Sequence, residues 1–228
     1  MTKNTSRAPV PLIVTLDGPA GVGKSTLAMQ VAQALGIGYL DTGAMFRTIA
    51  LKTLGQPIDM DDDGGKLLTT VGPLDFTLRS TPEGSELLCN DAPITEAIRN
   101  ESVAVQAANI AIFPAIRDFL KHCQQTIGKS TSLVAEGRDM GTVVFPEARY
   151  KFFLDANVEV RAKRRYDQLL LMQQEANIEE ISEQIRLRDN QDRNRPVAPL
   201  IPAKDAITID TSYLTIEEVL AAILQHCG

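Results

Sequence analysis

The chain carries the sequence Gly18-Pro19-Ala20-Gly21-Val22-Gly23-Lys24-Ser25 near its N-terminus. A short run rich in β-branched residues, 10–16, precedes it, and apolar residues at helical spacing follow it from 25 to 35. Residues 18–25 match the motif G-x-x-x-x-G-K-[ST], which here lies between an expected strand and an expected helix. Glycines let consecutive backbone N–H groups approach phosphate oxygens without Cβ clashes, and a helix N-terminus adds partial positive charge. The stretch therefore predicts a loop that binds a nucleoside triphosphate.

Two side chains of this loop carry the expected chemistry. Lys24 can reach the β- and γ-phosphates, and Ser25 can place its hydroxyl on Mg²⁺. We expect the nucleotide to contact Gly18, Pro19, Ala20, Gly21, Val22, Gly23, Lys24, Ser25 and Thr26.

Predicted strands and helices alternate along the rest of the chain. Further strands are expected over 37–40, 132–135, 150–154 and 206–209, and further helices over 45–54, 157–173 and 215–225. This order is typical of a parallel sheet that is covered by helices on both faces. The expected fold class is therefore α/β, with three layers and a parallel sheet of about five strands.

Two segments interrupt the alternation. Residues 57–100 are acidic and rich in turns, and they include a predicted β-hairpin of strands 74–79 and 86–90 joined by residues 81–85. We interpret this segment as a small β-containing insert. Residues 176–202 form a polar helix that ends in prolines, and its few apolar residues suit a mobile flap over a site. A solvated surface helix is the alternative interpretation.

Arginines follow the predicted strands. Arg47 ends the string Asp41-Thr42-Gly43-Ala44-Met45-Phe46-Arg47, and Arg138 lies in Glu136-Gly137-Arg138-Asp139-Met140-Gly141. Ligands of open α/β sheets bind beyond the carboxyl ends of the strands, so both arginines should lie near the phosphate-binding loop. They would then face a second anion beside the triphosphate. A phosphoryl acceptor that is itself a phosphate fits this arrangement.

Arg188, Asp192 and Arg195 are spaced i, i+4, i+7, which predicts one helix face with two cations and a carboxylate. Such a face can bind a phosphate together with polar atoms of a sugar or base. Alternatively, Arg188–Asp192 and Asp189–Arg193 are ordinary surface ion pairs of small energetic value. The spacing leaves both interpretations open.

Composition excludes several classes. Lys and Arg number 23 against 29 Asp and Glu, so the net charge of −6 gives no support for binding a nucleic-acid polymer. Arginine outnumbers lysine by 14 to 9, which suits small anionic ligands. Residues 1–9 are polar, and no apolar run approaches the roughly 18 residues that span a bilayer. Three scattered cysteines fit a reducing compartment, so we expect a cytoplasmic protein without a membrane segment.

Four strings stand out together: Leu16-Asp17-Gly18-Pro19-Ala20, residues 41–47, residues 136–146 and residues 188–200. They resemble the bacterial-type cytidylate kinases, a family of P-loop nucleoside monophosphate kinases. The resemblance implies transfer of the γ-phosphoryl group of ATP to CMP or dCMP, with Mg²⁺. It also implies a monomer with one domain over 1–228, in which an enlarged monophosphate-binding insert lies at about 57–100 and a helical lid at about 157–200.

The resemblance further implies roles for individual residues. Catalysis would rest on Lys24, Arg138, Arg188 and Arg193, with the metal at Ser25. The monophosphate substrate would be bound by Thr42, Phe46, Arg47, Arg117, Gly137, Arg138, Asp139, Arg188, Asp192 and Arg195. Within this set, Arg47 and Arg138 would hold the phosphate, Thr42, Arg117, Asp139 and Arg195 would read the cytosine, and Arg188 with Asp192 would reach the ribose.

The chain departs from the family's usual residues at three positions. Phe46 stands where the family often has Tyr, Ala108 where a hydroxyl can lie near the sugar, and Gln191 where the lid commonly has a charge. None of these changes removes a phosphate-holding arginine. We therefore expect activity, and leave the preference between CMP and dCMP open.

Other functional classes fit parts of the sequence. Residues 40–44 also spell the signature of retroviral-type aspartic proteases, although the motif occurs once and leads directly into a helical pattern. A P-loop kinase acting on UMP, AMP or a non-nucleotide fits the phosphate-binding loop alone. A nucleotide-binding regulator without turnover is a further alternative, against which the intact Lys24 and Ser25 argue.

Overall fold

The computed structural model describes residues 10–82 and 84–227; the polar residues 1–9, Glu83 of the expected hairpin loop and Gly228 lie outside this part. Its strands are β1 (Ile13–Asp17), β2 (Gly38–Asp41), β3 (Phe76–Thr81), β4 (Gly84–Cys89), β5 (Ala92–Pro93), β6 (Leu133–Gly137), β7 (Tyr150–Asp155) and β8 (Ile207–Asp210). Its helices are α1 (Lys24–Leu35), α2 (Thr42–Lys52), α3 (Gly65–Val71), α4 (Glu101–Ile110), α5 (Pro114–Ser130), α6 (Val158–Leu171), α7 (Ile178–Asn194) and α8 (Ile216–Cys227). A 3₁₀ turn (Glu96–Arg99) and a π-helical turn (Met140–Val144) join them.

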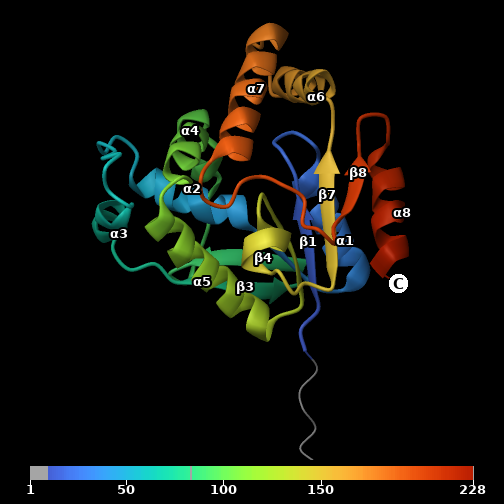
Figure 1. The fold of residues 1–228 in the computed structure, drawn as a ribbon, viewed down its shortest axis with the longest axis horizontal. Coiled ribbons are helices and arrows are strands. Elements are labelled where there is room, and N and C mark those ends of the chain that lie inside the picture. The colour runs from blue at the N-terminus through green and yellow to red at the C-terminus, as the bar shows by residue number, and fades with distance from the viewer. Residues whose placement is uncertain (1–9, 83, 228) are drawn as a thin grey trace, which may run out of the picture.

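Five strands form a parallel sheet in the order β2-β6-β1-β7-β8 (Figure 1), which confirms the predicted α/β class. The central strand β1 shows how the layers arise, because its side chains alternate between the two faces. Val14 and Leu16 pack against α1 and α8, whereas Ile13 packs in the second core beneath α2, α4 and α5. Both faces of the sheet are therefore covered, as a parallel sheet requires.

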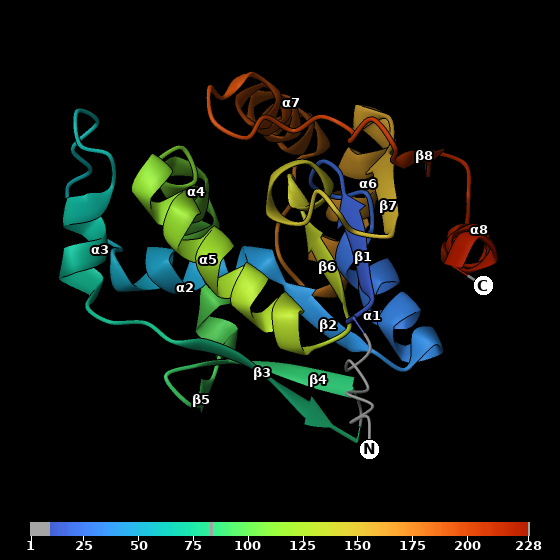
Figure 2. The same ribbon diagram turned by 60° about the horizontal axis from the view of Figure 1, so that its bottom comes forward.

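A small antiparallel sheet, β3-β4-β5, lies along the free edge of β2 (Figure 2). The two sheets are joined through Ser85 of β4, whose Oγ accepts a hydrogen bond from Tyr39 N at 2.7 Å and donates one to Tyr39 O at 3.2 Å. This contact covers backbone groups that an edge strand would otherwise leave open to pairing. The predicted β-containing insert is thus present in the segment 57–100.

The boundaries of the predicted hairpin are wrong. We expected a connection over residues 81–85, but the ladder continues through the pairs Ser80–Ser85 and Thr81–Gly84. Thr81 and Ser85 therefore belong to the strands, and the connection is shorter than the turn-forming residues suggested. Polar residues at this end of the hairpin are exposed or half-buried, so their polarity does not oppose strand pairing.

Helices α6 and α7 form a hairpin beyond the carboxyl end of the sheet (Figure 1). Their shared core is small, with Ala162, Ile181 and Ile185 buried. Helix α7 ends at Asn194, and Arg195 has extended backbone with ψ 141°. The expectation that Arg188, Asp192 and Arg195 share one helical face is therefore wrong for Arg195. The physical reason is Pro196, which disfavours helical backbone in the residue before it.

Within residues 10–82 and 84–227, no single helix is long and apolar enough to cross a membrane. Helices α4 and α5 taken together have the length and apolar composition of a membrane-spanning helix, but they meet at a bend of 102°.

Candidate active site

The loop between β1 and α1 passes close against the end of β7. A Cβ at Gly18, where φ is +152°, would lie 2.1 Å from the carbonyl oxygen of Leu154, so no larger residue fits without movement of the backbone. Gly23 has φ +93° and caps α1, which begins at Lys24. The loop and the N-terminus of α1 therefore lie at the carboxyl edge of the sheet, where the sequence predicted triphosphate binding.

Lys24 is a cation in an unfavourable place. Its side chain is 6% exposed, and Nζ donates a hydrogen bond to Pro19 O at 2.6 Å. Burial, together with the charges of the nearby Arg138 and Arg188, lowers the pKa of Lys24 to about 7, while Glu136 opposes this shift. An anion bound among these groups would relieve their mutual repulsion.

Arg47, Arg138 and Arg188 come from α2, the turn after β6 and α7, and they lie close enough for their charges to interact. Burial, together with the charges of Arg138 and Arg47, lowers the pKa of Arg188 to about 10. The Nε atom of Arg188 is buried and has no hydrogen-bond partner in the described part of the chain. Together with Lys24 of α1, these arginines form the cation cluster, to which four parts of the chain contribute.

Asp192 of α7 does not form the expected surface pair with Arg188. It accepts a hydrogen bond from Arg138 Nε at 2.9 Å, and its other oxygen lies 3.5 Å from Arg195 Nη1. Burial by itself would raise the pKa of Asp192, but Arg138 holds it below its usual value. The surface-pair interpretation of Arg188–Asp192 is therefore wrong, and Asp192 connects the cation cluster to the region around Arg195.

A cavity of about 120 Å³ lies beside this connection, between α2, α5 and the segment after α7. Arg117, 8% exposed, donates a hydrogen bond to Asp139 Oδ2 at 2.5 Å and lies over the Phe46 ring at 5.6 Å from its centroid. Arg195 Nη2 lies 3.8 Å from Asp139 Oδ1 and is otherwise unpartnered among the described residues. The cavity is lined by Phe46, Arg117, Asp118, Leu120, Lys121, Gln124, Asp139, Met140, Val143, Val144, Val197 and Ala198. The cavity has an aromatic wall and fixed charged groups, so it suits a ligand with a flat ring and polar edges.

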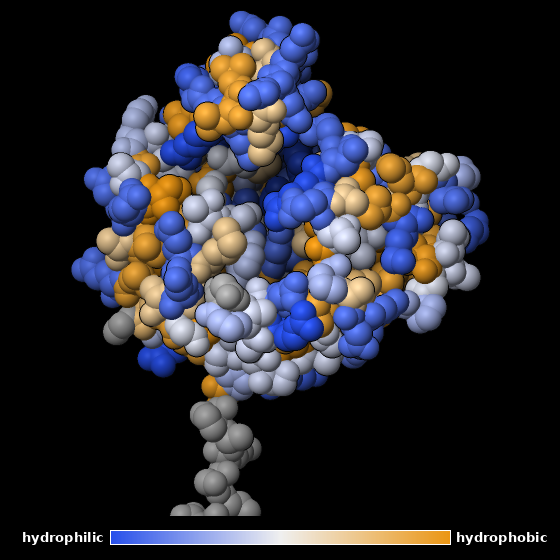
Figure 3. Space-filling view, turned by 180° about the vertical axis from the view of Figure 1, so that it is seen from behind, coloured by the Kyte–Doolittle hydropathy of each residue, from blue (hydrophilic) through white to orange (hydrophobic). Residues whose placement is uncertain are grey.

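Thr42 and Gly137 lie where β2 and β6 end. Thr42 Oγ1 donates to Glu136 O at 2.7 Å, which fixes the start of α2 against β6. A Cβ at Gly137 would approach Met140 Cε to 2.8 Å and Thr42 Oγ1 to 2.9 Å. Both residues therefore pack closely where the start of α2 meets the end of β6. Seen from behind, the molecule is hollowed below the α6–α7 hairpin, and hydrophilic residues gather around the hollow (Figure 3).

A family model for cytidylate kinase matches residues 14–228. A cytidylate kinase of Nitratidesulfovibrio vulgaris (strain DP4) is 55% identical over 214 residues, which cover 94% of this chain and 91% of that relative. Cytidylate kinases of Oleidesulfovibrio alaskensis and Pasteurella multocida are 51% and 42% identical, cover 93% and 94% of this chain, and are themselves covered to 96% and 94%.

The chain belongs to the cytidylate kinase family. Membership confirms the resemblance of the four strings noted in the sequence. The aspartic-protease interpretation of residues 40–44 is wrong, because Asp41 ends a parallel strand and caps a helix. Its Oδ1 accepts a hydrogen bond from Ala44 N at 2.9 Å, which holds the first turn of α2.

The residues of this cytidylate kinase family member fit a magnesium ion. Ser25 is exposed at the start of α1, and the buried Glu136 and half-buried Asp41 supply carboxylates on the neighbouring strand ends. Burial raises the pKa of Glu136, Asp41 raises it further, and Lys24 and Ser25 oppose this. Hard oxygen donors of this kind suit Mg²⁺, which retains waters and needs few protein ligands. The sequence predicts only Ser25 as a magnesium ligand. Glu136 could have been predicted as well, because it lies at the end of the strand β6.

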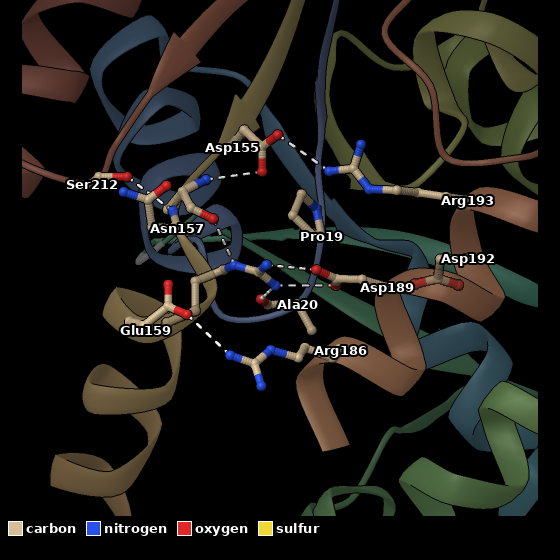
Figure 4. A network of polar contacts seen from close by, with 12 residues as sticks. Pro19, Ala20, Asp155, Asn157, Glu159, Arg186, Asp189, Asp192, Arg193 and Ser212 are labelled. Carbon is tan, nitrogen blue, oxygen red and sulfur yellow. Dashed lines mark hydrogen bonds and ion pairs between the residues drawn. The ribbon is translucent and has the colours of Figure 1, made fainter. Parts of the chain in front are cut away.

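Arg193 lies apart from the cation cluster. Its Nη2 donates to Asp155 Oδ2 at 3.2 Å, at the end of β7 and beside the phosphate-binding loop (Figure 4). The expected surface pair of Arg193 with Asp189 is not formed. The catalytic role of Arg193 stays a prediction.

Sequence reasoning missed Arg161, which is 2% exposed in the first turn of α6. It binds Asp189 of α7 through two nitrogens, at 3.0 and 2.5 Å (Figure 4). Helical spacing predicts only a surface pair of Asp189 with Arg193. No local signal marks this pair, because its members lie on different helices.

The three departures from the usual cytidylate kinase residues lie in different surroundings. Phe46 supplies the ring beneath Arg117, so the position packs a cation rather than offering a hydroxyl. Ala108 is half-buried on α4, and Gln191 is exposed on α7. Neither Phe46 nor Gln191 interrupts the contacts among the arginines described above.

Proposed function

We propose that this protein transfers the γ-phosphoryl group of ATP to CMP or dCMP, giving CDP or dCDP and ADP. The observation that carries the proposal is a continuous series of charged contacts, Arg138–Asp192–Arg195–Asp139–Arg117, which runs from the cation cluster to the cavity beside Phe46. A nucleoside monophosphate has the matching order of groups, with a dianion at one end and a flat base at the other. Family membership supports cytidine as the nucleoside.

The triphosphate would lie on the loop Gly18–Thr26, with Lys24 released from Pro19 O to reach its β- and γ-phosphates. Ser25 and Glu136 would hold Mg²⁺, which when bound neutralises phosphate charge. Burial of Lys24 among arginines supports this assignment, because such a site favours an anion over an empty state.

The acceptor would extend from the cation cluster into the cavity beside Phe46. Arg47 and Arg138 would hold its phosphate, and Arg188 with Asp192 would lie at its sugar. Thr42, Arg117, Asp139 and Arg195 would read its base, and Phe46 and Gly137 would also bind the substrate. The unpartnered donors Arg188 Nε and Arg195 Nη2 support these roles, because buried donors without partners are costly unless a ligand accepts from them.

The chemistry needs no side-chain base. The second pKa of a phosphate monoester lies near 6, so the attacking oxygen of the acceptor is largely ionised at neutral pH. The protein must bring two anions together and stabilise the charge that spreads during transfer. Lys24, Arg138, Arg188 and Arg193 would supply that stabilisation. The α6–α7 hairpin, as part of the lid at about 157–200, would carry two of these arginines over the nucleotide and exclude water.

The insert at about 57–100 would serve the monophosphate side of the site within one domain over 1–228. We further propose that the protein acts as a cytoplasmic monomer on small nucleotides rather than on a nucleic-acid polymer. Its net charge of −6 supports the last point.

ADP formation from Mg·ATP tests the proposal, with CMP, dCMP, UMP and AMP as parallel acceptors. We expect fast turnover with CMP and dCMP and little with AMP, and the ratio between the first two shows how Ala108 affects the choice of sugar. Lys24→Ala should abolish turnover and leave the fold intact by circular dichroism. Turnover with none of the four acceptors would refute the assignment of CMP and dCMP as substrates. A near-normal rate for Lys24→Ala would refute the role of the phosphate-binding loop in catalysis.

A further inference from the structure

Arg161 joins three parts of the active site at once. Its Nε donates to Ala156 O at 2.9 Å, at the end of β7, and its Nη1 donates to Ala20 O at 3.2 Å, in the phosphate-binding loop. Both terminal nitrogens also bind the carboxylate of Asp189 on α7 (Figure 4). The loop itself packs on the arginine, since a Cβ at Gly21 would lie 3.3 Å from Arg161 Cβ.

Asp189 fixes how α7 presents its other charged residues. It precedes Asp192 and Arg193 by about one helical turn, and these bind Arg138 and Asp155 respectively. Arg188, its direct neighbour, belongs to the cation cluster, and its Nε is unpartnered among the described residues. Because α7 shares only a small apolar core with α6, the fork between Arg161 and Asp189 is the fixed polar point that relates α7 to the loop.

We propose that Arg161 and Asp189 are positioning residues, which couple the phosphate-binding loop to α7 and so place Arg188 and Arg193 when a nucleotide occupies the loop. A nucleotide that moves the backbone at Ala20 acts directly on Arg161, and through the bidentate fork on the orientation of α7. Neither residue touches the reacting groups. The proposal rests on the proposed function insofar as the loop binds ATP or ADP.

The chain offers a matched control. Arg186 of α7 donates to Glu159 of α6 at 3.1 Å, so this pair joins the same two helices (Figure 4). Its side chains are 56% and 72% exposed, and among the described residues the pair forms no hydrogen bond or ion pair with the phosphate-binding loop. A general effect of joining α6 to α7 would appear at both pairs, whereas coupling to the loop is expected only at Arg161 and Asp189.

Hydrogen exchange and kinetics test the proposal in the full chain. ADP alone should slow amide exchange in α7 of the wild-type protein. Asp189→Asn should bind ADP within threefold of wild type by calorimetry, lose this protection of α7, and show kcat reduced at least thirtyfold with KM for ATP changed less than threefold. Arg161→Lys keeps the cation but not the planar fork, and should show the same pattern. Glu159→Gln should retain both the protection and kcat within twofold.

The outcomes separate the two proposals. Wild-type protein that fails to bind ADP would overturn the proposed function. ADP binding without protection of α7, retained protection in Asp189→Asn, or a kcat of Asp189→Asn within threefold of wild type would overturn the coupling alone. Equal losses in Glu159→Gln and Asp189→Asn would also overturn it, because they would indicate a merely structural link between the helices.

Discussion

At the scale of single residues, Lys24 connects stability with function. Its folded-state pKa of about 7 lies well below the 10.5 of a free lysine, because burial and neighbouring arginines disfavour its charge. Below pH 7 the residue is charged in both the folded and the unfolded chain, so folding then carries the full free-energy cost of burying this charge. The cost falls as pH rises from 7 towards 10.5, where the folded chain holds fewer protons than the unfolded one.

Lys24→Met should therefore stabilise the free protein, and more strongly at pH 6 than at pH 9. One pKa unit corresponds to about 1.4 kcal/mol, so we expect a gain on the order of a few kcal/mol at pH 6. Urea unfolding at the two pH values measures it. Lys163→Met, which removes an exposed lysine of α6, is the control and should show no comparable difference. A gain that is equal at both pH values would contradict the prediction.

Arg195 allows a second test at this scale. Because Arg195 lies on Asp139 beside the cavity and not on the phosphate-binding loop, Arg195→Ala should raise KM for CMP more than KM for ATP. Loss of hydrogen bonds from a charged donor costs about 1.5–3 kcal/mol, which corresponds to roughly tenfold to hundredfold in KM for CMP. Initial rates with each substrate varied in turn measure both constants, with Arg186→Ala as control. Equal increases in KM for CMP and KM for ATP would contradict the assignment of Arg195 to the site that binds the cytosine base.

At the scale of elements, the sequence predicted what local patterns determine. The strands β1, β6 and β7 were found because short apolar runs are typical of strands buried on both faces. The phosphate-binding loop was found because its glycines and Lys24 are adjacent in the chain. Arg47 and Arg138 were expected near that loop because the ends of parallel strands meet at one edge.

The partners of charged residues could not be predicted in the same way. Helical spacing suggested that Asp189 and Asp192 pair within α7, but their partners are Arg161 and Arg138, on other elements 28 and 54 residues away. Spacing along a helix reveals only which residues share a face, and not which foreign side chain lies opposite. The end of α7 before Arg195 was also missed, although Pro196 gave a local signal for it.

The insert and the main sheet meet at Ser85, which gives a prediction for elements. Ser85→Ala removes the side-chain partner of both Tyr39 N and Tyr39 O at the edge of β2. Unsatisfied groups of this kind cost about 1–3 kcal/mol, so the midpoint of urea unfolding should fall accordingly. Ser80→Ala changes the exposed serine opposite Ser85 in the hairpin and should have an effect within about 0.5 kcal/mol. Similar effects of the two substitutions would show that the edge contact contributes little.

At the scale of the whole molecule, the exposed apolar residues of the described chain are spread over many elements, although Leu170, Leu171 and Met172 are adjacent at the end of α6. Val10, Met60, Val105, Leu171 and Tyr213, each more than half exposed, lie in different parts of the fold. A stable dimer needs a contiguous patch, so we predict a monomer. Size-exclusion chromatography with light scattering should give a mass of 24.9 kDa at micromolar concentration. A mass near twice this value would contradict the prediction.

The position of β1 in the sheet has a consequence for synthesis of the chain. Leu16 is in register with Glu136 and Phe152, which follow it by 120 and 136 residues. At about 5–20 residues per second, the ribosome needs roughly 7–30 s to deliver both neighbours of β1. Meanwhile the β3–β4 hairpin can pair with locally available partners, but β1 cannot. Among the described strands, the one that leads into the nucleotide loop is therefore made before its partners and is among the last to complete its pairing, which leaves it accessible to chaperones during synthesis.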